Sequence, residues 1–235
     1  MYSSRWKDLF TYGQVKRTIP LPWKEANKLL SFYVSTRFDG DVKGSVRTAF
    51  GPGYLSESAL TLGAGLSSKT WHHLTFWGEA GEAVKYVPNR RDAATPDYRG
   101  GLNLAKGFGS LLGSHTSGFF YETTADVVYV SQFDKDWLYY SQNRAGRTFR
   151  AWGNTSAQTL WNLNYVRDLK NEYWANTVEA GPGLKLHMPW MPKNVYLSAD
   201  FLRGFYLDGP FIDNQFHPHH DYNDFRLSFW YAITK

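Results

Sequence analysis

The chain carries the sequence YNDFRLSFWYAITK at residues 222–235, in which apolar and polar side chains alternate. Phe225, Leu227 and Phe229 share one parity, whereas Arg226 and Ser228 share the other. Successive side chains of a β-strand point to opposite faces of the sheet. A period of two therefore predicts a strand with one apolar and one polar face.

The same period of two recurs along most of the chain. It is clear at residues 30–39, 74–86, 119–129, 177–188 and 195–201. Turn-rich stretches separate these segments, at residues 39–41, 51–53, 88–92, 153–156 and 208–223. We expect about ten to twelve strands of about 10–14 residues, which exceeds the usual length in soluble sheets and suits tilted strands that cross a bilayer.

These strands predict an all-β fold, an antiparallel up-and-down transmembrane β-barrel of about 10–12 strands. Twelve is favoured because most such barrels have an even number of strands. We expect residues 1–235 to form a single outer-membrane domain. Residues 1–28 could supply a first strand plus a turn or plug segment, and residues 23–30 a short helix in that turn or plug.

The composition agrees with a membrane barrel. Aromatic residues make up 18% of the chain, with 16 Phe, 16 Tyr and 10 Trp, and barrels place aromatic girdles at both membrane interfaces. No apolar stretch approaches the ~20 residues of a transmembrane helix. The net charge of +5 comes without a basic run, so nucleic acid is not an expected partner. Because no apolar signal segment follows Met1, we expect a mature form or the C-terminal part of a longer protein.

A soluble β-sandwich or lipocalin-like barrel is the alternative fold, since it also alternates apolar and polar faces. Charges of both signs in the middle of the polar faces favour a wet barrel interior instead. The candidates for residues that face this lumen are Glu79, Lys85, Glu122, Asp126, Glu179, Lys185, Asp200 and Arg226. They could line water and set selectivity, or they could pair with one another and fill a narrow barrel.

Three arginines recur every three residues at Arg144, Arg147 and Arg150, with Gln142 and Asn143 beside them. Arginine, asparagine and aromatic side chains suit saccharide contact, because sugars need hydrogen-bond donors and stacking surfaces. A period of three within a strand sends side chains to alternate faces, however. That consideration favours a loop or an interface for these residues.

Catalytic and metal chemistry find little support in the sequence. Residues 217–221 (HPHHD) contain metal-ligand types, but adjacent side chains of an extended chain point apart, which favours a polar loop. Ser and His are present without a recognisable nucleophile motif. We expect no metal, no cofactor and no enzymatic activity.

Four stretches carry a family resemblance: YSQNRAGR (residues 140–147), LWNLNYVRD (residues 160–168), NTVEAGPGLKLHMPWMPKNVYLSADFLRGFYL (residues 176–207) and YNDFRLSFWYAITK (residues 222–235). They resemble the C-terminal barrel of NfrA-type phage-adsorption proteins. Those barrels are related in plan to the exopolysaccharide-export barrels of the PgaA and BcsC kind. The resemblance implies an outer-membrane barrel for passage of a saccharide or for surface recognition.

Three functions are therefore open. The first is passive passage of a hydrated, saccharide-type substrate, or surface recognition. The second is a filled barrel that anchors loops near residues 88–97 and 208–223, which would bind a phage or an envelope protein. The third is an outer-membrane lipid-modifying enzyme. In each case the surroundings would be outer-membrane lipid and lipopolysaccharide.

Overall fold

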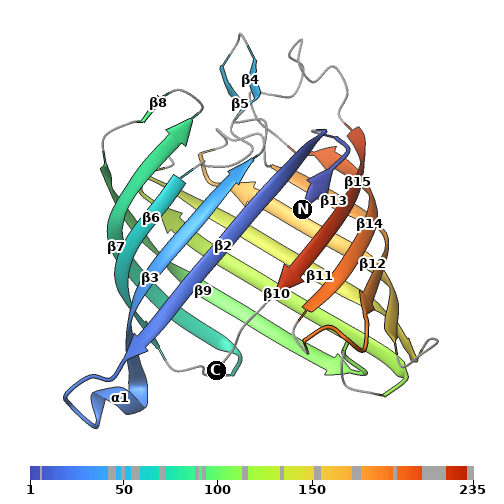
Figure 1. Cartoon of the computed structure of the whole chain (residues 1–235), viewed down its shortest axis with the longest axis horizontal. Coiled ribbons are helices and arrows are strands. Elements are labelled where there is room, and N and C mark those ends of the chain that lie inside the picture. The colour runs from blue at the N-terminus through green and yellow to red at the C-terminus, as the bar shows by residue number, and fades with distance from the viewer. Residues whose placement is uncertain are drawn as a thin grey trace. The chain divides into compact units, whose positions relative to one another are not determined.

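Long antiparallel strands make up most of the chain in the computed structural model of the protein (Figure 1). The structure describes residues 1–5, 7–41, 46–48, 51–53, 59–68, 72–87, 90–91, 94–112, 116–132, 135–150, 155–170, 176–192, 195–207 and 221–231. The strands are β1 (Tyr2–Ser3), β2 (Asp8–Ile19), β3 (Leu30–Asp41), β4 (Val46–Thr48), β5 (Gly51–Gly53), β6 (Ala59–Ser68), β7 (Leu74–Val87), β8 (Arg90–Arg91), β9 (Thr95–Gly109), β10 (Gly118–Val130), β11 (Asp136–Arg150), β12 (Ser156–Asp168), β13 (Thr177–His187), β14 (Val195–Tyr206) and β15 (Asp221–Tyr231). One short helix, α1 (Ala26–Leu29), lies in the turn between β2 and β3.

Strand pairing defines the topology. The large sheet has the order β6-β3-β2-β1-β15-β14-β13-β12-β11-β10-β9-β7-β8, and β6 also pairs with β7. That additional pairing closes the order, and β8 is only a two-residue extension beside β7. The fold is therefore an antiparallel up-and-down β-barrel of 12 strands with almost no helix. The predicted all-β barrel and its favoured strand number are confirmed.

Two faces with opposite chemistry follow from the alternation. On β15, Leu227 and Phe229 are exposed, whereas Asp224 and Ser228, which have the opposite parity, are buried. The same inversion holds on β13, where Glu179 and Lys185 are among the buried side chains. A soluble sheet would bury its apolar face, whereas here the apolar face is exposed and charged groups are buried. This pattern is that of a transmembrane β-barrel and argues against the soluble alternative.

No helix among the described residues is long and apolar enough to cross a membrane.

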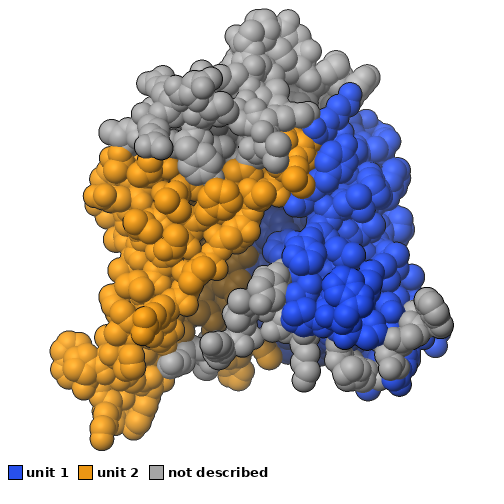
Figure 2. Space-filling view, viewed as in Figure 1, with its two compact units in different colours: residues 1–7, 105–125, 140–235 blue, residues 8–104, 126–139 orange. Residues whose placement is uncertain are grey.

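Two compact units make up the chain, and Figure 2 shows them in different colours. Unit 1 consists of residues 1–7, 105–125 and 140–235, and its strands β12 to β15 pair in sequence, with β1 beside β15. Unit 2 consists of residues 8–104 and 126–139, and in it β2, β3, β6 and β7 pair in turn before β7 pairs with β9.

Each unit contains a tyrosine ring packed on a glycine of the neighbouring strand. In unit 2, Tyr33 pairs with Gly65, and a Cβ on Gly65 would lie 2.7 Å from the Tyr33 Cζ atom. In unit 1, Tyr222 pairs with Gly204, and the corresponding distance to the Tyr222 Cζ atom is 2.1 Å. Only glycine leaves room for a ring laid flat across the strand, so each pair fixes where its tyrosine lies on the polar face.

Three predicted breaks are wrong. Residues 39–41 belong to β3 rather than to a turn, because β2 continues opposite them and Phe10 pairs with Asp41. Residues 51–53 form β5, which pairs with β4. The loop predicted near residues 88–97 ends earlier, since β9 begins at Thr95, which pairs with Ala83 of β7. In each case the neighbouring strand supplies backbone partners that override the local preference of Gly, Asp and Pro for turns.

Candidate functional site

In unit 1, buried charges on β13 and β15 contact one another. The Glu179 carboxylate, 5% exposed, accepts hydrogen bonds from the Arg226 guanidinium and, at 2.7 Å, from the Tyr222 hydroxyl. Arg226 Nε also donates to Asp224 Oδ2 at 2.7 Å, and Asp224 accepts a further hydrogen bond of 2.7 Å from Ser3. This network ties β1, β13 and β15 together on the polar face.

A second network in unit 1 joins β10 to β14. The ammonium group of Lys185, 3% exposed, forms an ion pair with Glu122. Asn162 bridges the other members, because it accepts a hydrogen bond from Arg144 Nε at 3.0 Å and donates one to Asp200 Oδ1 at 2.8 Å. Lys185 and Glu122 thus compensate each other directly, whereas the Asn162 amide links Arg144 to Asp200.

In unit 2, the buried charges cluster around Asp97. Asp97 Oδ2 accepts hydrogen bonds from Arg37 Nη2 at 2.9 Å and from Arg99 Nε at 2.8 Å. Arg37 also lies 3.7 Å from Glu79. These four side chains come from β3, β7 and β9, and they lie on the polar face, where the two carboxylates compensate the two guanidiniums.

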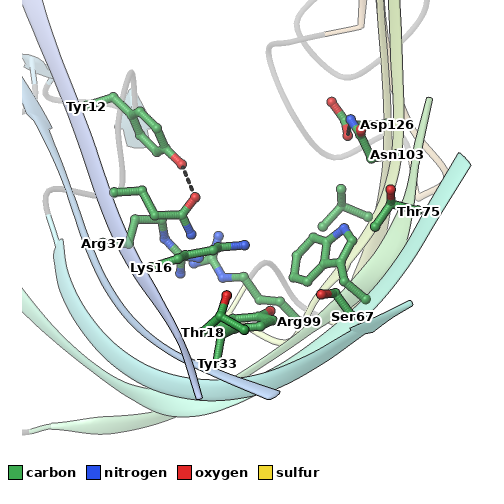
Figure 3. A pocket seen from close by; sticks show the side chains of 13 residues that line it. Tyr12, Lys16, Thr18, Tyr33, Arg37, Ser67, Thr75, Arg99, Asn103 and Asp126 are labelled. Carbon is green, nitrogen blue, oxygen red and sulfur yellow. Dashed lines mark hydrogen bonds between the residues drawn. The ribbon is translucent and has the colours of Figure 1, made fainter. Parts of the chain in front are cut away.

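A cavity of about 520 Å³ opens beside this cluster, and all the residues that line it belong to unit 2. Figure 3 shows Lys16 and Arg37 on one side of it, and Asn103 and Asp126 on the other. The side chains point from the strands into the concave side of the curved sheet. Lys16 Nζ lies 4.6 Å from the centre of the Tyr33 ring and 5.4 Å from that of the Trp77 ring.

The wall opposite Lys16 is neutral or acidic. Asn103 Nδ2 donates to Asp126 Oδ1 at 2.7 Å, and Thr75 and Ser67 add hydroxyl groups to the lining. Pockets that bind small molecules commonly have volumes of about 300–1,000 Å³ and combine ring surfaces with a few placed polar groups. The unit 2 cavity has that size and that chemistry, so it is the candidate functional site.

The described members of the predicted lumen residues fall into four groups. Glu79 belongs to the Asp97 cluster and Asp126 to the cavity wall. The other described members lie in the two unit 1 networks: Glu122, Lys185 and Asp200 in one, Glu179 and Arg226 in the other. The side chain of Lys85 lies outside the described residues. The described members all lie on the polar face, and their role in a lumen stays a prediction.

The arginine triplet does not converge on one site. All three residues lie in strand β11, so the expectation of a loop is wrong. Arg144 joins the Asn162 network, whereas the guanidinium of Arg147 lies 5.7 Å from the ring centres of Phe119 and Phe149. Arg150 ends the strand on an exposed position. A period of three in a strand places neighbouring members on opposite faces, which separates Arg147 from the others.

The principal cavity residues were absent from the sequence-based candidates. Tyr33 and Arg37 follow the same alternation as the predicted residues, so parity alone could have included them. Trp77 shares the parity of Glu79 and Lys85 in the predicted strand 74–86, so parity could have included it as well. Lys16 lies outside the alternating segments found in the sequence, and its contact with Trp77 depends on β2 and β7 meeting across β3 and β6.

Among the described residues, no group of three or more His, Asp or Glu side chains could hold a metal ion. In the sequence HPHHD, residues 217–220 lie outside the described part. Asp221 forms an ion pair with Arg203.

A scan against protein-family models and a search of curated proteins find no match to this chain.

Proposed function

We propose that this protein is an outer-membrane β-barrel that binds a hydrated saccharide in the unit 2 cavity and allows it to pass. The observation that carries the proposal is the cavity itself, which combines the rings of Tyr33 and Trp77 with hydroxyl and amide groups. Sugars present both apolar ring faces and many hydroxyls. A site that offers aromatic surfaces and hydrogen-bonding groups meets both needs.

The mechanism we propose is passive and involves no catalysis. Weak contacts to several side chains hold a hydrated substrate long enough to admit it and release it again. The exposed apolar face would contact outer-membrane lipid and lipopolysaccharide. The sequence resembles NfrA-type phage-adsorption barrels, which are related in plan to exopolysaccharide-export barrels. That relation supports an outer-membrane location and a saccharide as the substrate.

Conductance in planar lipid bilayers tests passage directly. We expect open channels whose current falls when a neutral β-1,4-linked glucose trimer is added. The variant Trp77→Ala should weaken this block about fivefold, since stacking on an aromatic ring contributes on the order of 1 kcal/mol. Trp161→Ala is the matched control, because Trp161 lies exposed on the apolar face of β12 in unit 1.

Two results would overturn the proposal. A correctly folded barrel that never conducts would exclude passage. Channels that the trimer does not block, or that it blocks equally well in Trp77→Ala, would exclude saccharide binding at this cavity. Heat-modifiable migration on a gel would establish that each variant is folded before it is measured.

A membrane anchor or receptor is the second candidate, and the unit 1 networks favour it. There Glu179 and Lys185 form ion pairs with other side chains, so their charges are already compensated and bind a passing substrate only weakly. In that case, loops near residues 88–97 and 208–223 would bind the partner, and of these, residues 88–89, 92–93 and 208–220 lie outside the described part of the chain. A folded barrel without conductance that still captures a phage or an envelope protein would support this function.

A further inference from the structure

Among the described residues, Lys16 differs from the other cations of the unit 2 cavity in forming no ion pair with a carboxylate, and Glu79 acts on it only through longer-range electrostatics. Arg37 and Arg99 both donate to Asp97, so their charges are compensated. Over the part of the chain that the structure describes, the contacts of the Lys16 ammonium are the faces of the Tyr33 and Trp77 rings. Its side chain is exposed to the cavity. A positive charge is thus available beside two ring surfaces.

An ammonium group over aromatic faces is attracted only weakly when the site is open to water, with a strength of about 0.5–1 kcal/mol. A carboxylate that enters the cavity would form a charge-assisted hydrogen bond, which is roughly twice as strong as a neutral one. The sugar ring of the same ligand would lie against the neighbouring Trp77 ring. The ammonium and the ring together therefore form both parts of a binding site for an acidic sugar.

We propose that the cavity selects carboxylated saccharides, with the ligand carboxylate bound by Lys16 and the sugar ring stacked on Trp77. This inference rests on the proposed saccharide function and names its substrate class. Hydroxyl groups on the far side of the sugar would meet Asn103 and Asp126, which Figure 3 places opposite Lys16. Strands β3, β6 and β7 separate the strand of Lys16 from the strand of Asn103, so these groups lie on different walls of the cavity.

A phosphate is a poorer match to this arrangement. Phosphate groups carry more charge and are best held by the paired donors of arginine. Both cavity arginines are already bound to Asp97, and Asp126 adds a negative charge to the lining. The single positive charge of Lys16 balances the single negative charge of a carboxylate. A phosphate dianion at the same place would leave one negative charge uncompensated.

The test compares two matched probes on the full-length barrel in planar bilayers. One is the β-1,4-linked glucose trimer, and the other is the corresponding glucuronic acid trimer. We expect the acidic trimer to block about tenfold more tightly at 0.1 M salt, which corresponds to one charge-assisted contact. The preference should shrink in 1 M salt, because the Lys16 ammonium is open to solvent.

Variants of two neighbouring residues on β2 test whether Lys16 causes the preference for the acidic trimer. Lys16→Gln should bring the ratio of acidic to neutral block close to one, because the ligand carboxylate loses its cation. Arg17→Gln removes the same charge from the same strand but on the opposite face, and it should behave like the wild-type protein.

The outcomes separate this inference from the proposed function. If both trimers block equally, or if Lys16→Gln keeps the acidic preference, the carboxylate site is wrong although the saccharide function stands. If inorganic phosphate blocks the channel as tightly as the glucuronic acid trimer does, the site is a general anion site and the inference is overturned. If neither trimer blocks an open channel, the proposed saccharide function fails as well.

Discussion

Replacing Arg226 by methionine should destabilise the barrel more than any surface substitution of the same kind. The change leaves Glu179 and Asp224 buried, at 5% and 0% exposure, without their shared cation. Removing one partner of a buried ion pair commonly costs about 3–5 kcal/mol. Glu179 keeps its hydrogen bond from Tyr222, and Asp224 keeps that from Ser3. We therefore expect a loss near the lower end of this range, about 3 kcal/mol.

The matched control is Arg203→Met on the neighbouring strand β14. Arg203 pairs with Asp221, and the two side chains are 47% and 36% exposed. Exposed pairs contribute about 0–1 kcal/mol. The double variant Arg226→Met, Glu179→Gln should recover part of the lost stability, because it removes the stranded charge.

The free energy of unfolding would be measured by urea titration of the protein refolded in lipid vesicles, with tryptophan fluorescence as the signal. Equal stability of the Arg226 and Arg203 variants would refute the reasoning. So would a double variant that is less stable than Arg226→Met alone, since the cost would then not arise from the uncompensated carboxylate.

Two further substitutions test packing and membrane placement by the same titration. Gly65→Ala should cost about 1–3 kcal/mol, because the added Cβ would clash with the Gly78 backbone oxygen and with the Tyr33 ring. Gly13→Ala, with no atom within 4 Å of the added Cβ, should be nearly neutral. Similar behaviour of the two variants would exclude a required close approach at Gly65. Leu227→Arg in the middle of β15 should lower the free energy of unfolding by about 2–4 kcal/mol. Asn223→Arg, on the same face but nearer the strand end, should lower it by only about 0–1 kcal/mol. Equal losses at the two positions would contradict a bilayer around the strand.

The sequence by itself determined the strands and their two faces. Strand geometry sends every second side chain to the same side, so Leu227 and Arg226 could be assigned to opposite faces without knowledge of any other strand. The length of the alternating segments and the abundance of aromatic residues then indicated a membrane barrel. The assignment of faces and the inference of a membrane barrel depend on the order and composition of the residues, so neither requires knowledge of which strands are neighbours.

Only the tertiary structure decided which charges are compensated and which are available. Arg37 meets Asp97 across 60 positions of sequence, and Lys16 reaches Trp77 over two intervening strands. These encounters depend on strand order and register, and a shift of one residue would turn each side chain to the other face. The alternation within one strand specifies neither the strand order nor the register. The available cation at Lys16, on which the proposed selectivity depends, therefore emerges from the pairing of strands rather than from any motif.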